Sequence, residues 1–232
     1  MKSILVVLDG SPGGRKAAYT AYDIATRTGA KLIGAALTAL QSQAAAEQVL
    51  KEFMTGARAA GVSVTGDYFP SLADAWLAFQ NLPIDAVFIA KNCLNDETLL
   101  VDWSAQASCP LWIIPGQRDI RRLLALYDDS PAAPTALSAA VDFSRRWQLE
   151  LRLLVTKQGI LVDELLTNDG EEGIAVTLQV TPDSDLELLF RHIDASRIDL
   201  AFVGKPDDAQ ILLELCQRTN CLLAICPLLN SS

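Results

Sequence analysis

Little in this sequence could build a metal centre or a conventional hydrolase. The 232 residues contain a single histidine, His192, and five cysteines, and no two cysteines form a C-x-x-C pair. Because zinc sites are assembled from closely spaced cysteines and histidines, metal ligation has little support. A Ser-His-Asp enzyme would need a serine on a G-x-S-x-G turn, and that motif is absent as well. The cysteines have the character of small core hydrophobes in a reducing compartment.

Long apolar runs and basic clusters are also missing. No stretch approaches the roughly 20 apolar residues that span a bilayer, and the first residues run directly into a predicted strand without the features of a signal peptide. We therefore expect a cytoplasmic protein without a membrane partner. The net charge of −9 is uneven, with −1 on residues 1–118 and −8 on residues 119–232. Because acidic surfaces repel phosphate backbones, a nucleic-acid partner is not expected.

The chain contains an internal repeat. A short apolar run followed by an acid, a serine and a proline occurs at residues 4–12 and again at 123–131. A period of roughly 115 residues is too long for a solenoid and suits two duplicated domains, which we place at 1–118 and 119–232. Two further pairs of segments repeat, 84–88 with 198–202 and 109–115 with 221–227.

Within each half, apolar runs typical of buried strands alternate with helical patterns. This alternation predicts a doubly wound α/β domain with a parallel sheet and helices on both faces, present twice. Pro12 stands where a helix commonly begins, with Ser11 as its N-cap. The predicted strands are 3–8, 31–37, 62–68, 85–90 and 111–114, then 122–127, 149–156, 174–180, 200–203 and 222–225. The predicted helices are 13–28, 41–60, 72–80 and 96–107, then 135–147, 162–166, 185–192 and 207–218.

The order of these motifs resembles the universal stress protein family, once in each half. The resemblance rests on a strand ending in Asp9-Gly10-Ser11, on Ala30-Lys31-Leu32, on a strand beginning at Ile84-Asp85 and on a last strand after Cys109-Pro110. It implies a five-stranded sheet in the order 3-2-1-4-5 in each half. Tandem members commonly pair their fifth strands, here 111–114 and 222–225, into a pseudo-dimer.

Nucleotide-binding members of that family hold ATP with the acid closing strand one and with a glycine motif after strand four. The first glycine of the motif falls on Ala90 in the first half and survives as Gly204 in the second. The second glycine position holds Cys93 and Asp207, and neither half has the later Gly-Ser pair. Carboxylates follow at 96, 97 and 208, where they would repel phosphate. The resemblance therefore implies that neither half binds ATP in the family's manner.

A ligand crevice is nevertheless expected at the carboxyl edge of each sheet, where strands one and four diverge. Two lysines directly follow strand four at the same position of the repeat, so we predict the ion pairs Asp9–Lys91 and Asp128–Lys205. The alternative is that each acid caps its own turn and each lysine is a solvated surface charge. The candidate residues are Asp9, Ser11 and Lys91 in the first half and Asp128, Ser130, Gly204 and Lys205 in the second.

These observations predict a cytoplasmic stress-response protein that is not an enzyme, has no cofactor and acts by binding or regulating a protein partner. A basic partner would suit the charge of residues 119–232, and a free surface could form a homodimer. One alternative is an ATP or AMP sensor that uses one half, and Gly204 favours the second half. Another is a binder of an apolar or lipid-like ligand between the halves.

Overall fold

The chain divides into two compact units, Met1–Arg118 and Asp119–Ser232, here named the first unit and the second unit. The computed structural model describes residues 1–79, 82–95, 103, 108–116, 119–128, 130–156, 176–180 and 186–228. The helices predicted over 96–107 and 162–166 lie outside the described residues, apart from Trp103.

The first unit is built on a parallel sheet in the order β3-β2-β1-β4-β5. All residues of β1, β4 and β5 are buried, as the continuous apolar runs in the sequence predict for central strands. By contrast, β3 lies at the edge and alternates half-buried and exposed residues over most of its length. The strands are β1 (Ser3–Leu8), β2 (Lys31–Leu37), β3 (Val64–Phe69), β4 (Ala86–Ala90) and β5 (Leu111–Ile114).

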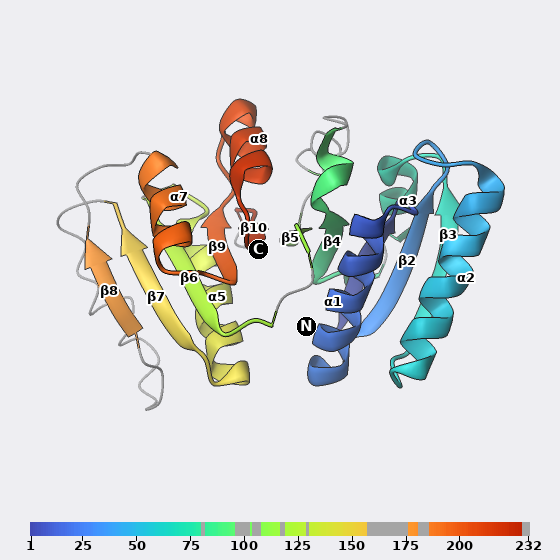
Figure 1. Ribbon diagram of the computed structural model, residues 1–232, viewed down its shortest axis with the longest axis horizontal. Coiled ribbons are helices and arrows are strands. Elements are labelled where there is room, and N and C mark those ends of the chain that lie inside the picture. The colour runs from blue at the N-terminus through green and yellow to red at the C-terminus, as the bar shows by residue number, and fades with distance from the viewer. Residues whose placement is uncertain are drawn as a thin grey trace. The chain divides into compact units, whose positions relative to one another are not determined.

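Helices cover both faces of this sheet. Figure 1 shows α1 and α2 side by side on the near face and α3 behind the strands. At its start α1 is capped by the side chain of Ser11, and it ends at Gly29, whose φ of 72° is the left-handed conformation that glycine favours. The helices are α1 (Pro12–Thr28), α2 (Gln43–Ala59), α3 (Leu72–Phe79) and the short 3-10 helix η1 (Lys91–Asn95).

The second unit repeats the plan with the strand order β10-β9-β6-β7-β8, again parallel throughout. Numbered within its own unit, this order is the predicted 3-2-1-4-5, so the predicted fold class is confirmed. The pairing of the two fifth strands stays a prediction. The elements are β6 (Arg122–Tyr127), α5 (Ala133–Trp147), β7 (Glu150–Val155), β8 (Val176–Val180), α7 (Leu186–Ala195), β9 (Leu200–Gly204), α8 (Ala209–Arg218) and β10 (Leu222–Cys226).

In each unit, one repeated aspartate holds the amino ends of the central strands together through hydrogen bonds. The Asp85 carboxylate accepts hydrogen bonds from the backbone N–H groups of Lys2 and Ser3, and its counterpart Asp199 accepts from Arg121 and Arg122. These acids precede β4 and β9, so they tie strand four to the start of strand one. These acids have a structural role at the amino ends of the strands. The candidate site lies at the opposite, carboxyl edge of each sheet.

Candidate functional site

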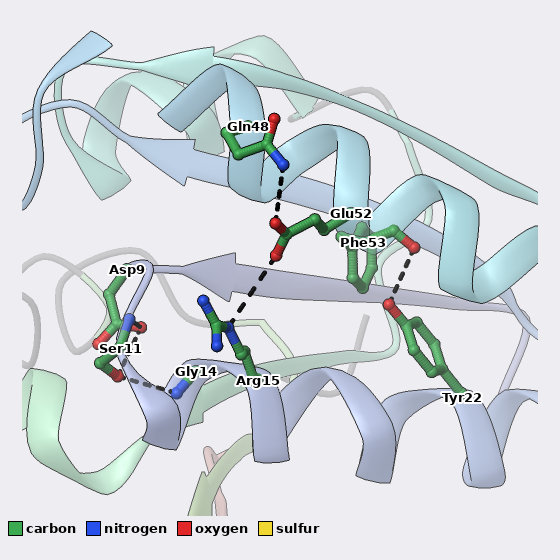
Figure 2. A network of polar contacts seen from close by, with 8 residues as sticks. All are labelled: Asp9, Ser11, Gly14, Arg15, Tyr22, Gln48, Glu52 and Phe53. Carbon is green, nitrogen blue, oxygen red and sulfur yellow. Dashed lines mark hydrogen bonds and ion pairs between the residues drawn. The ribbon is translucent and has the colours of Figure 1, made fainter. Parts of the chain in front are cut away.

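Asp9 follows β1 at the carboxyl edge of the first sheet and organises the turn into α1. One of its oxygens, Oδ1, accepts hydrogen bonds from the backbone N–H of Ser11 at 3.1 Å and from the Ser11 hydroxyl at 2.9 Å. The same hydroxyl oxygen accepts the N–H of Gly14 at 2.9 Å and so caps the helix. Figure 2 shows these three residues together at the start of α1. Asp9 therefore caps its own turn, which was the simpler of the two predicted roles.

Two residues of η1 complete the network around Asp9. The Asn92 amide donates to Asp9 Oδ2 at 3.0 Å and to the Ser11 hydroxyl at 2.8 Å. The Cys93 thiol donates to the same carboxylate oxygen at 2.9 Å. Sequence reasoning singled out Lys91, which begins η1, and missed the two residues after it. The Asp9–Lys91 ion pair stays a prediction.

This network is packed directly against the first turn of α1. A methyl group at Gly13 would overlap the Asn92 amide, and one at Gly14 would overlap the Asp9 carboxylate. A larger residue at either position would therefore displace the Asn92 or Asp9 side chain from its hydrogen bonds. Burial, reinforced by the hydrogen bond to Asp9 and by its charge, raises the pKa of the Cys93 thiol well above its usual range. The thiol is thus held protonated, as a donor to the carboxylate.

In the described part of the second unit, the corresponding edge shows fewer hydrogen bonds around its acid. The Asp128 carboxylate accepts the backbone N–H of Ser130 at 3.2 Å, which reproduces the turn made by Asp9. The Ser130 hydroxyl oxygen, however, is buried and has no hydrogen-bond partner among the residues that the structure describes. The N-cap position of α5 is Ala132, which offers no side-chain cap. The two edges therefore share the acid and differ in what surrounds it.

Gly204, the surviving glycine of the family motif, has a packing role. A methyl group there would lie 2.7 Å from the Ser130 hydroxyl oxygen and 2.9 Å from the backbone nitrogen of Ala133. Because backbone cannot move aside as a flexible side chain can, the start of α5 reaches the end of β9 only if residue 204 lacks a side chain. The presence of this glycine is explained without any phosphate.

The residues after Gly204 correct a second expectation. Among the described residues no carboxylate oxygen lies within 4.0 Å of the Lys205 ammonium, so the predicted Asp128–Lys205 ion pair is not formed. The Asp128 carboxylate is held by backbone instead, and a half-exposed lysine gains little from pairing. Asp208, expected to repel phosphate, caps α8 by accepting the N–H of Gln210 at 2.7 Å.

Metal and membrane sites have no counterpart in the described part of the chain. Its residues hold no cluster of three or more His, Cys, Asp or Glu side chains that could bind a metal ion. None of its helices is both long enough and apolar enough to cross a bilayer.

Comparison with known proteins gives relatives by structure and none by sequence. No family model matches the chain, and no curated protein matches it. Its structure is similar to a universal stress protein from Archaeoglobus fulgidus DSM 4304, with a TM-score of 0.73 and 15% identity over 97% of this chain and 98% of that chain. A proposed universal stress protein from Pseudomonas aeruginosa UCBPP-PA14 gives 0.70 and 17%, over 98% and 93%. A protein of unknown function from Pseudomonas aeruginosa PAO1 gives 0.65 and 16%, over 98% and 92%.

The likeness extends over nearly the whole of each chain compared. This chain therefore has the doubly wound fold of the universal stress proteins along nearly its full length. At such low identities, the fold is what the likeness shows.

Proposed function

We propose that this chain is a tandem universal stress protein that acts as a non-catalytic binding or regulatory module and does not hold ATP in the family's manner. The observation that carries the proposal is the filled carboxyl edge of the first sheet. Asp9, Ser11, Asn92 and Cys93 bond to one another there and pack against the first turn of α1.

A phosphate at this edge would find no free partner in the network. The N–H groups of Ser11 and Gly14 already donate to oxygens of the chain itself. A phosphate would have to displace these bonds and would then face the Asp9 carboxylate, whose charge has the same sign. The lost hydrogen bonds and the charge repulsion both disfavour phosphate, whose binding sites rely on free backbone N–H groups.

The second unit supports the proposal through a different residue. The helix after strand four is α8, and its amino end would attract a phosphate through the helix dipole. In this chain the Asp208 carboxylate caps that end. The Asp208 carboxylate therefore occupies the helix end where the dipole would favour a bound phosphate.

The chemistry of Cys93 supports a role without catalysis. A cysteine beside an aspartate could be a nucleophile only as its thiolate. Burial and the neighbouring carboxylate raise the pKa of this thiol, so the reactive form is suppressed at neutral pH. The thiol instead serves as a donor within the network.

Thermal unfolding with ATP and with AMP, each with and without magnesium, tests the proposal. A ligand present at a hundred times its Kd stabilises a protein by about 2.7 kcal/mol, which raises the unfolding temperature measurably. We expect no shift with either nucleotide at millimolar concentration. A shift that grows with nucleotide concentration would overturn the proposal.

A nucleotide sensor that uses the second unit is the second candidate, favoured by the buried Ser130 hydroxyl beside Asp128, for which the described ranges supply no partner. If a shift is seen, matched variants locate it. Binding at the second unit would be lost in Asp128→Asn and kept in Asp9→Asn. Loss in Asp9→Asn alone would place the nucleotide in the first unit and contradict the role given to its network.

A further inference from the structure

A pocket lies between α1 and α2 in the first unit and borders the network around Asp9 at Gly14. Its volume is about 90 Å³, and it opens to solvent. Small and apolar residues such as Ala18 and Val49 line its interior, and Tyr19, Tyr22 and Phe53 contribute aromatic rings. The side chains that form the Asp9 network do not line this pocket.

Two rings of the aromatic wall, those of Tyr22 and Phe53, are fixed in place by contacts between the helices. The Tyr22 hydroxyl donates to the backbone oxygen of Phe53 at 2.9 Å, which joins α1 to α2 (Figure 2). The Tyr22 ring lies 5.5 Å from the Phe53 ring and meets Tyr19 edge to face at 5.8 Å. Gly56 makes room, since a methyl group there would lie 2.9 Å from Tyr22. The pocket therefore offers preformed ring surfaces to a ligand.

A charged pair stands at the same pocket. Figure 2 shows Arg15 of α1 reaching toward Glu52 of α2, with Arg15 Nε 4.0 Å from Glu52 Oε2. Both side chains are about half exposed, and an ion pair of that length and exposure contributes little to stability. Glu52 also accepts a hydrogen bond from Gln48 at 2.8 Å, so it keeps a partner if Arg15 turns away. Arg15 is thus available to an incoming anion.

From this combination we propose that the pocket binds a small molecule with one aromatic ring and a carboxylate. The ring would lie against Tyr19 and Tyr22, and the carboxylate would replace Glu52 as the partner of Arg15. The planar guanidinium of arginine matches a carboxylate with two parallel hydrogen bonds. An apolar cavity of about 150 Å³ encloses benzene, so a smaller open pocket takes one ring in part and leaves its carboxylate at the rim. A purine, with two fused rings, would leave most of its area outside the pocket.

Ligand titrations followed by NMR, with benzoate as the probe, test this proposal on the intact protein. We expect saturable shifts of the Tyr19 and Tyr22 ring signals, with an affinity about tenfold higher for benzoate than for benzyl alcohol, which lacks the charge. Cyclohexanecarboxylate keeps the charge without the aromatic ring and is expected to bind less tightly than benzoate. Adenosine should leave these ring signals unchanged.

Matched variants separate the charge from the cavity. Arg15→Gln should lower benzoate affinity to that of benzyl alcohol and leave benzyl alcohol binding unchanged. Arg58→Gln, an exposed arginine at the far end of α2 that does not line the pocket, should change neither. Ala18→Leu should fill the cavity and abolish the binding of both ligands.

Two results would overturn the proposal without any variant. One is the absence of saturable Tyr19 and Tyr22 shifts with benzoate. The other is equal affinity for benzoate and benzyl alcohol, or for benzoate and cyclohexanecarboxylate. Benzoate binding that persists unchanged in Arg15→Gln would likewise remove Arg15 from the site.

Discussion

Two serines of the first unit cap helices of equal length, and they differ in what else they bond. Ser11 caps α1 and also bonds to Asp9 and Asn92, whereas Ser42 caps α2 through one exposed bond at 3.3 Å. Replacing an N-cap serine by alanine typically costs about 1 kcal/mol. We expect Ser11→Ala to lower the free energy of unfolding by about 2 kcal/mol, because a partly buried network loses the residue at its centre, and Ser42→Ala by about 0.5 kcal/mol. Urea unfolding of both variants checks this, and equal losses would contradict it.

Buried thiols make stability depend on pH above neutrality. Burial raises the pKa of Cys109 to about 12 from the ordinary 9.0, with a smaller contribution from the charge of Asp85. Between these two values the unfolded chain loses the proton that the folded chain keeps, so the free energy of unfolding falls as the pH rises. Below pH 9 both states hold the proton and the effect vanishes. The slope reaches about 1.4 kcal/mol per pH unit for one thiol.

Urea unfolding of the first unit over this alkaline range, compared with Cys109→Ala, isolates the contribution of that thiol. The variant should lose stability less steeply with rising pH, because the titrating group is gone. Its lower stability at neutral pH, caused by the smaller side chain, does not affect the slope. Identical slopes in the two proteins would show that Cys109 titrates normally.

At the scale of elements, the sequence predicts the segments that repeat and the strands that are continuously apolar. The buried strands β1, β4 and β5 are found as predicted, because a run of apolar residues between turn signals has few other uses. Contacts between distant segments were not predictable in the same way. Nothing in the local pattern of Asn92 and Cys93 shows that their side chains reach Asp9, 83 and 84 positions away.

The same limit explains why the sequence motif assigns Gly204 to a phosphate site. A motif assigns a role to a residue from its position in the sequence. The actual role depends on the atoms that surround the residue in the fold. Gly204 meets the first turn of α5, more than 70 residues earlier. Aspartate 208 likewise suggested repulsion of phosphate, and its position as the N-cap of α8 followed only from where that helix begins.

Substitution of glycines tests this packing role. We expect Gly204→Ala to destabilise the second unit by about 1–3 kcal/mol, the usual cost of forcing an extra carbon into a packed interior. Gly116 is a matched control, because the nearest atom to a methyl group there would be 3.9 Å away. Gly116→Ala should change stability by less than about 0.5 kcal/mol. If Gly204→Ala were equally neutral, the start of α5 would not depend on residue 204.

At the scale of the whole molecule, the two units have kept one fold and diverged in the charge they carry. Residues 1–118 are nearly neutral, and residues 119–232 carry −8. Both units retain the acid after strand one and the acid that fastens its start. The two units differ in the residues around the acid after strand one and in the charge that they carry. A regulatory module with one acidic unit would suit a basic partner, whose binding should weaken as salt rises.

This asymmetry predicts that salt acts differently on the two units. Like charges repel within a folded unit, and salt screens the repulsion, so added salt should stabilise the acidic unit more than the neutral one. Exposed pairs such as Arg218–Glu187 oppose the trend only weakly. Amide hydrogen exchange at low and moderate sodium chloride measures both units in one sample. Exchange in β6 and β9 should slow relative to β1 and β4 as salt rises, since their residues occupy the same places in the fold. An equal response of the four strands would mean that the charge of −8 is too dispersed to strain the second unit.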